Sequence, residues 1–251
     1  MLIMGILNVT PDSFADGGRH NDFDAAVARG LEMIAEGVDI IDIGGESTRP
    51  GADRVSEAEE IERTIPVIAE LAKHGARISI DTMRASTAEA AIKAGASIIN
   101  DVSGGLADPN MLHTAARLQV PYIAMHWRGQ SKDMNSKAIY GDVVSDVISE
   151  LQERISAALD AGIQPGNLII DPGLGFAKEA EHNWKIVDSI DKFVELGYPV
   201  LIGASRKRFL GGESPDEREQ ATIELTKRLA TTGIWAVRVH SVKPHREVLA
   251  Q

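Results

Sequence analysis

The sequence predicts an α/β protein built as a single (β/α)8 TIM barrel, and two observations support this. Short apolar runs alternate with longer helical patterns along the whole chain. There are eight such runs, and several are almost entirely apolar, as strands buried on both faces should be. Strict alternation of strand and helix favours a parallel sheet, and eight units favour closure into a barrel. An open, doubly wound sheet is the structural alternative.

The elements follow in order along the chain. The predicted strands are 2–7, 39–43, 77–80, 97–99, 121–125, 168–170, 199–202 and 234–239. The clearest helical patterns between them are 24–37, 56–75, 86–95, 142–162 and 216–231. These patterns begin with Ser or Asp, which are expected N-caps, and several end on Gly, which is typical of a helix C-terminus.

Length and composition predict one soluble domain, residues 1–251. The chain is close to the roughly 250 residues typical of a TIM barrel. Lys plus Arg is 26 and Asp plus Glu is 37, a formal charge of −11, which argues against binding nucleic acid or an anionic membrane. The apolar start of the chain is too short to span a bilayer. There is no cysteine, so disulfides are excluded and a cytoplasmic location is expected.

Polar side chains follow the predicted strands. A single such residue is usually a turn former or a helix cap, but here every strand is followed by at least one. In a TIM barrel the carboxyl ends of the strands meet at one mouth, where the active site lies. We therefore expect one concave site that combines carboxylates and amides with basic side chains. The residues are Asn8, Asp42, Asp81, Asn100, Asp101, His126, Asp171, Ser205, Arg206, Lys207, Arg238 and His240.

Two long segments carry a family resemblance. Residues 4–14 (MGILNVTPDSF) and 44–51 (GGESTRPG) closely resemble the signatures of dihydropteroate synthases. Shorter matches follow in the family's order at 79–82, 99–101, 125–126, 171–173, 203–207 and 238–240. The resemblance covers essentially the whole chain. It implies a TIM-barrel enzyme that condenses 6-hydroxymethyl-7,8-dihydropterin pyrophosphate with p-aminobenzoate to give 7,8-dihydropteroate and pyrophosphate.

The resemblance also implies a pterin site deep in the barrel. Its residues would be Asp81, Asn100, Met125, Asp171 and Lys207. Buried carboxylates can accept hydrogen bonds from the N–H groups of the pterin edge, and an amide can both donate and accept. The alternative for Asp81 is a helix N-cap before Ser86.

A pyrophosphate site is implied next to the pterin. Asn8, Arg238 and His240 would hold the anion, and Mg²⁺ would join it through Asn8. Arginine offers a planar fork to phosphate oxygens. The alternative for Arg238 and His240 is that strand alternation turns them outward.

The p-aminobenzoate site implied by the family has an apolar face and a set of donors. Its residues would be Thr48, Arg49, Pro50, Phe176, Ser205 and Lys207. The segments 9–19 and 44–54 are rich in Gly, Pro, Asp and Ser, so we expect loops that order only when pterin and pyrophosphate are bound.

The implied reaction needs no protein nucleophile. A carboxylate near the pterin would stabilise a developing cation, while Mg²⁺ and basic side chains would stabilise the leaving pyrophosphate. The expected catalytic residues are Asp81, Asp171, Lys207, Arg238 and His240. Ser205 is not expected to be a hydrolase nucleophile, because the Gly-x-Ser-x-Gly motif is absent.

Some features depart from the family pattern: many members carry an extra segment before the first strand, which here starts at once. Ser241 stands where Asp is common, and the last helix after Val242 is short. Two other functions are also weighed. The alternatives are a methyltransferase that passes a methyl group from a methylated folate to a corrinoid protein, and an inactive paralogue that only binds pterin. The resemblance further implies a homodimer formed through helices late in the chain.

Overall fold

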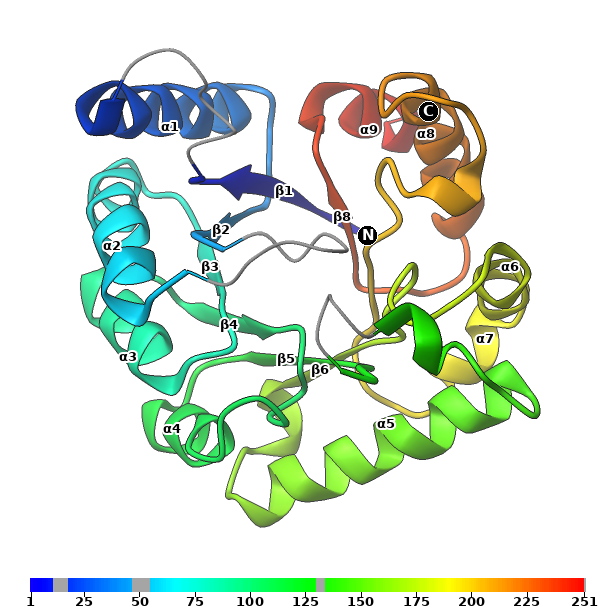
Figure 1. The fold of residues 1–251 in the computed structure, drawn as a ribbon. Coiled ribbons are helices and arrows are strands. Elements are labelled where there is room, and N and C mark those ends of the chain that lie inside the picture. The colour runs from blue at the N-terminus through cyan, green and yellow to red at the C-terminus, as the bar shows by residue number, and fades with distance from the viewer. Residues whose placement is uncertain (11–17, 47–54, 130–133, 251) are drawn as a thin grey trace.

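The computed structural model describes residues 1–10, 18–46, 55–129 and 134–250, and forms a barrel of parallel strands ringed by helices (Figure 1). The strands are β1 (Leu2–Asn8), β2 (Ile40–Gly44), β3 (Ile78–Asp81), β4 (Ile98–Asp101), β5 (Tyr122–Met125), β6 (Leu168–Asp171), β7 (Leu201–Ile202) and β8 (Ala236–Val239). The α-helices are α1 (Gly18–Ala35), α2 (Glu57–Lys73), α3 (Ala85–Ala94), α4 (Met111–Leu118), α5 (Val143–Asp160), α6 (Ala180–Asp188), α7 (Ile190–Val194), α8 (Glu217–Leu229) and α9 (Val242–Leu249).

The sheet closes on itself, which confirms the predicted single barrel. Its strand order is β6-β5-β4-β3-β2-β1-β8-β7, so the first strand pairs with the last. The remaining gap, between β6 and β7, is closed by one parallel bridge from Ile170 to Val200 and by the hydrogen bond from Ile170 N to Pro199 O, at 2.9 Å. The open-sheet alternative is therefore wrong.

The helix ends agree only in part with the sequence-based expectations. The Ser56 and Asp142 side chains cap α2 and α5 by accepting hydrogen bonds from backbone N–H groups of the first turn. However, Ser86 lies inside α3, whose N-cap is Arg84. Helix α1 already begins at Gly18, so Asp24 is not its cap. The Asp216 side chain makes no capping hydrogen bond at the start of α8.

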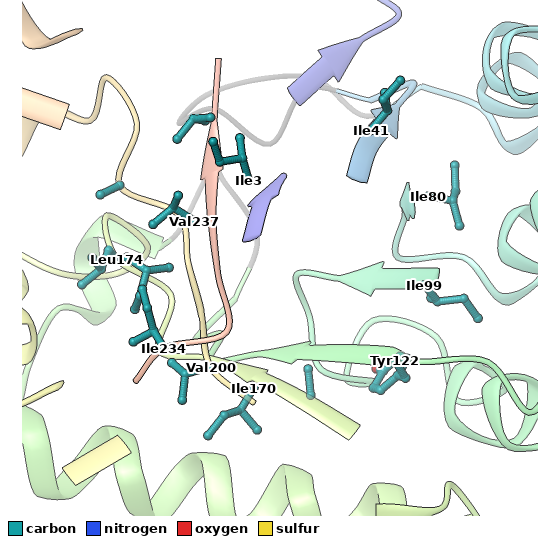
Figure 2. Packing of buried hydrophobic residues seen from close by; sticks show 14 of the residues in the cluster. Ile3, Ile41, Ile80, Ile99, Tyr122, Ile170, Leu174, Val200, Ile234 and Val237 are labelled. Atoms are coloured by element: carbon teal, nitrogen blue, oxygen red, sulfur yellow. The ribbon is translucent and has the colours of Figure 1, made fainter. Parts of the chain in front are cut away.

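The apolar core has two parts, one on each face of the strands. The larger part lies between the strands and the helices, where Ile41, Ile80, Ile99 and Tyr122 sit on the helix side of the barrel wall (Figure 2). The smaller part fills the barrel interior and consists of Met4, Ile40, Ile98, Ile123, Ile169, Leu201 and Ala236. Since side chains alternate along a strand, the residue two positions after each interior residue also points inward, closer to the mouth.

The short last helix still covers its side of the barrel. Val242 and His245 of α9 are fully buried, and the space beside Gly5 of β1 is filled by the Val242 side chain. None of the helices in the described part of the chain is both long and apolar enough to cross a bilayer.

Candidate active site at the barrel mouth

Strand alternation places the polar residues of the mouth in one layer. The residues two positions after the interior apolar layer are Ile6, Asp42, Asn100, Met125, Asp171, Gly203 and Arg238. Strand β3 contributes Ser79 and Asp81 to the same face, because Ser79 is in register with Asp42 and Asp81 with Asn100. Charged and amide side chains therefore form a layer next to the apolar residues that fill the barrel interior, on the side of the mouth.

Arg238 is the centre of a buried network on one side of this layer. Its Nε donates to Asp42 Oδ2 and its Nη2 donates to Asp81 Oδ2, both at 2.6 Å. Asp42, which is fully buried, also accepts a hydrogen bond from Asn100 Nδ2 at 3.1 Å. Four strands thus contribute to one connected set of donors and acceptors.

Burial and charge act in opposite directions on this network. Burial raises the pKa of Asp81 to about 7, although the Arg238 guanidinium opposes the shift. Burial alone would lower the pKa of Arg238, but Asp42 and Asp81 outweigh it and raise that pKa above its ordinary value. Arg238 therefore stays charged, while Asp81 can change its protonation state near neutral pH.

Asp171 and Lys207 form the other side of the layer, and Gly203 leaves space between them. A Cβ atom at Gly203 would lie 3.8 Å from Asp171 Oδ2 and 3.9 Å from Lys207 Nζ. The same atom would lie 3.9 Å from Arg238 Cβ, so the three charged side chains converge there. Because Gly203 has no side chain, the space between these three side chains is not filled by residue 203.

Lys207 is held by groups that carry no formal charge. Its Nζ donates to the backbone carbonyl of Leu174 and lies 4.6 Å from the centroid of the Phe176 ring. Burial lowers the pKa of Lys207 to about 8, and Asp171 opposes this shift. Burial likewise raises the pKa of Asp171, against the opposing charge of Lys207.

Ser205 and His240 form a pair at the ends of β7 and β8. Ser205 Oγ lies 2.9 Å from His240 Nδ1 and accepts from His240 N at 3.2 Å. Between Ser205 and Lys207 stands Arg206, which has a left-handed backbone with φ of 58°. Its side chain donates to Glu219 at 2.6 Å and to Ser241 Oγ at 2.9 Å. Ser241 is thus part of the support behind the Ser205–His240 pair.

Asn8 and Met125 border the same mouth. Asn8 is in register with Gly44, which is in register with Asp81, so Asn8 stands two strands from that carboxylate. Met125 is buried, and a Cβ atom at Gly173 would lie 3.3 Å from its Cγ. Met125 therefore forms an apolar wall beside Asp171, whose Oδ1 accepts from Gly173 N.

The structure excludes two alternative roles considered for the site residues, a helix cap for Asp81 and an outward-facing Arg238. Asp81 is not a helix cap, because at the start of α3 Arg84 N donates to Thr82 Oγ1 and Ala85 N donates to Asp108. Arg238 does not point outward, since it reaches carboxylates inside the barrel.

Several expected residues lie together and others do not. Asp81, Asn100, Asp171, Lys207 and Arg238 share the interior layer or border it, as the contacts above establish. Asp101, in contrast, points to the helix side, where it accepts hydrogen bonds from Tyr122, Ser103 and Gly105. Thr48, Arg49, Pro50 and most of the two expected loops lie outside the described residues.

Sequence reasoning gave no role to two residues that the structure places at the site. Asp42 was counted among the polar residues of the mouth but given no binding or catalytic role, yet it bridges Arg238 and Asn100. The signal in the sequence was a carboxylate inside an otherwise apolar strand. A buried carboxylate is tolerated only when it is hydrogen-bonded or paired with a cation. Lys178 belongs to a segment, 173–178, whose spacing does not fit a phosphate-binding loop and which was therefore given no role, yet it holds the loop that carries Leu174 and Phe176.

A divalent cation would find few ligands in the described parts of the chain. No cluster of three or more His, Asp or Glu side chains suited to a metal forms there. Asn8 offers a single amide oxygen at the end of β1. This fits an ion such as Mg²⁺, which usually keeps several waters and shares its remaining positions with substrate phosphates.

The comparisons with known proteins agree with this geometry. The family model of pterin binding enzymes matches residues 4–240. The dihydropteroate synthase of Mycobacterium leprae is 48% identical over 257 residues, covering 98% of this chain and 90% of that relative. The chain belongs to the dihydropteroate synthase family.

Solved structures of the family have the same fold. The dihydropteroate synthase of Xanthomonas albilineans with 4-aminobenzoic acid has a TM-score of 0.93 and 44% identity, covering 99% of this chain and 90% of that one. The Xanthomonas albilineans enzyme in complex with 7,8-dihydropteroate has a TM-score of 0.90 and 40% identity, with coverages of 99% and 91%. The protein is therefore an enzyme of the transferase class, and the resemblance seen in the sequence is confirmed.

Proposed function

We propose that this enzyme joins 6-hydroxymethyl-7,8-dihydropterin pyrophosphate to p-aminobenzoate, releasing pyrophosphate and 7,8-dihydropteroate in folate biosynthesis. The observation that carries the proposal is the layer of Asp42, Asp81, Asn100, Asp171 and Arg238 at the mouth of the barrel. This layer combines carboxylate and amide oxygens, which can accept hydrogen bonds from the N–H groups of a pterin ring, with a guanidinium that can bind the pyrophosphate anion. The relatives named above support the choice of substrates.

The pterin would lie next to the apolar residues that fill the barrel interior, in the space beside Gly203. Asp81 and Asp171 accept from ring N–H groups, Asn100 donates and accepts, and Met125 packs against the ring. Lys207 donates to a ring acceptor. A ring without this pattern would leave buried polar groups unpaired, which provides selectivity.

The pyrophosphate would lie toward Asn8, Arg238 and His240. The Arg238 guanidinium already donates to two carboxylates, so its orientation is set before an anion arrives. Ser205 fixes the His240 ring through Nδ1, which directs Nε2 away from Ser205. When bound through Asn8, Mg²⁺ would supply further neutralisation of charge on the phosphate oxygens.

The p-aminobenzoate would approach between Phe176 and Lys207. The Phe176 ring offers an apolar face, and Ser205 and Lys207 offer donors to the carboxylate. Thr48, Arg49 and Pro50 complete this site in the proposal. Both substrates then meet at the pterin methylene carbon.

In the reaction, the C–O bond between that carbon and the pyrophosphate breaks, and its electron pair leaves with the pyrophosphate. The amine of p-aminobenzoate forms the new C–N bond and loses a proton. Positive charge that develops on the pterin is stabilised by Asp81 and Asp171, and negative charge on the leaving group by Arg238 and His240. The groups are held in place before the reaction, which is the main contribution of this kind of site.

The test is pyrophosphate release from purified protein supplied with the dihydropterin pyrophosphate and Mg²⁺, with and without p-aminobenzoate. We expect release that depends on p-aminobenzoate and falls on the order of 10²-fold or more in Lys207→Ala and Asp81→Ala. Tight pterin binding without such release would support the inactive paralogue. Methyl transfer from a methylated folate to a corrinoid would support the methyltransferase.

Two further properties belong to the same proposal. We infer a homodimer, with Trp184 of α6 at the contact, since its side chain is 37% exposed and packs edge-on against Phe209. Light scattering of wild type and Trp184→Glu would measure this state. A cytoplasmic location fits the lack of cysteine and the substrates.

A further inference from the structure

Lys178 lies behind the mouth, just before α6, and contacts none of the carboxylates described above. Its Nζ is within hydrogen-bond distance of three groups: His126 Nδ1 at 2.9 Å, Gly173 O at 3.0 Å and Phe176 O at 3.1 Å. A lysine ammonium has three donors and no acceptor. The three neighbours therefore match its donors one for one.

The His126 ring is oriented to accept from Lys178. His126 is buried, and its Nε2 lies 3.0 Å from Glu150 Oε2 on α5. Burial lowers the pKa of His126 to about 4, so the ring is neutral at pH 7. An Nε2–H that donates to Glu150 leaves the Nδ1 lone pair directed at Lys178. Burial also lowers the pKa of Lys178, to about 7, with Asp171 opposing the shift.

The two carbonyls that Lys178 binds belong to the loop 172–178, which follows β6. Three residues of this loop, Gly173, Gly175 and Ala177, have a left-handed backbone with φ values of 68°, 76° and 48°. Ala177 is unfavourable in this region and needs its surroundings to hold it there. Tyr140 OH gives additional support by donating to Ala177 O at 2.9 Å.

The other face of the same loop holds Lys207. The Leu174 carbonyl accepts from Lys207 Nζ, and the Phe176 ring lies 4.6 Å from that atom. Gly173 precedes Leu174 in the chain, and Phe176 carries both a carbonyl that binds Lys178 and the ring that faces Lys207. A shift of the two carbonyls therefore moves the groups that contact Lys207. A connected path thus runs from Glu150 through His126 and Lys178 to the ammonium group of Lys207.

We propose that Lys178 is a positioning residue, which holds the loop 172–178 so that Leu174 O and Phe176 place Lys207 for the second substrate. Lys178 does not touch the substrates. The inference rests on the proposed function, because its readout is the binding of p-aminobenzoate. Misplacing a binding group by about 1 Å can cost on the order of 10²-fold in rate, so even a small shift of the loop is measurable.

The test compares Lys178→Met with wild type in the pyrophosphate-release assay. Methionine keeps the apolar stem and removes the three donors. We expect the KM for p-aminobenzoate to rise roughly tenfold or more. The Kd for dihydropterin pyrophosphate, measured by calorimetry without p-aminobenzoate, should rise less than this KM, because Lys207 makes only one of several pterin contacts and Asp81 and Asn100 keep theirs. Lys185→Met is the matched control, since Lys185 is exposed on α6 and pairs with Glu181 on the same helix.

Several outcomes would overturn the proposal. One is a KM for p-aminobenzoate that stays within about twofold of wild type, as expected for Lys185→Met. Another is a loss of kcat and thermal stability with an unchanged KM, which would make Lys178 merely structural. If Lys178→Met does not fold, Tyr140→Phe removes one hydrogen bond to the same loop and should raise the same KM about two- to fivefold. An unchanged KM there would also reject the idea. An inactive wild type would instead reject the proposed function.

Discussion

Arg238 and Lys207 are two cations at the same barrel mouth, and they are held in opposite ways. Arg238 donates to the carboxylates of Asp42 and Asp81, both at 2.6 Å. Lys207 donates to a backbone carbonyl and faces an aromatic ring. The pKa of Arg238 is accordingly raised, whereas burial lowers the pKa of Lys207 to about 8.

The difference separates two tasks. A cation paired with two carboxylates is fixed in orientation, so besides facing the pyrophosphate it contributes to the stability of the interior layer and to the orientation of Asp81. A cation held by neutral groups keeps its net charge available to an anionic or electron-rich ligand. We therefore expect Arg238 to matter for folding and activity, and Lys207 mainly for activity.

The largest expected effect is a loss of stability in Arg238→Met. Removing the guanidinium leaves Asp42, which is fully buried, and Asp81 without their partner. Breaking a buried ion pair on one side costs about 3–5 kcal/mol. Urea denaturation should show a reduced free energy of unfolding of this size.

Lys207→Met is the matched control for that measurement. It removes one hydrogen bond to a carbonyl and the cost of burying an ammonium, so the free energy of unfolding should change by less than about 1 kcal/mol. Equal destabilisation of both variants would contradict the separation of tasks.

The next effect is a pH dependence that comes from Lys207. Its ammonium form is lost as the pH rises through about 8, so kcat/KM should fall about tenfold per pH unit above that value. The charged groups that face it are Asp171, Arg238 and Asp81. Asp81, with a pKa of about 7, should give the opposite limb at lower pH, where its carboxylate becomes protonated.

The variant Lys207→Arg separates these limbs. An arginine does not lose its proton in this range, so the alkaline limb should move to higher pH while the acid limb stays. A pH profile of kcat/KM with an unchanged alkaline limb would assign that limb to another group.

The smallest effect concerns the third cation of the mouth, Arg206, which pairs with Glu219 at 2.6 Å and Asp216 at 3.9 Å and also donates to the neutral Ser241. Ser241→Ala removes the neutral partner and leaves Glu219 in place. We expect a loss of about 0.5–1.5 kcal/mol in thermal or urea unfolding, with little change in kcat/KM. Ser86→Ala, at an exposed position of α3, is the control and should be near neutral. A drop above about 3 kcal/mol would show that Ser241 holds more than Arg206.

Much of the fold could be predicted from the sequence, because each strand is an apolar run that ends in a polar residue. The predicted strands match the observed ones within a few residues, and β7 is the shortest, with 199–202 reduced to Leu201–Ile202. Asp81, Asn100 and Asp171 were placed at strand ends, where the structure has them.

The roles of Asp42 and Lys178 could not be predicted, because they depend on how strands and loops that are distant in the sequence are arranged in space. All five residues of β2 are buried, so the sequence does not tell whether Asp42 or its neighbours face the interior. The stagger of the closed barrel decides this. Lys178 resembles an ordinary surface lysine after a Gly-rich loop, and its role depends on His126, which is 52 positions away in the chain.

The closure of the barrel between β6 and β7 has a consequence for ligand binding. This seam is held by a single bridge, and Asp171 and Lys207 stand on its two sides. A ligand that binds both side chains therefore links β6 to the end of β7, across the part of the barrel that has a single β-bridge. Part of the binding free energy then stabilises the closed barrel. The free energy of unfolding should therefore be larger for the ligand-bound protein than for the free protein.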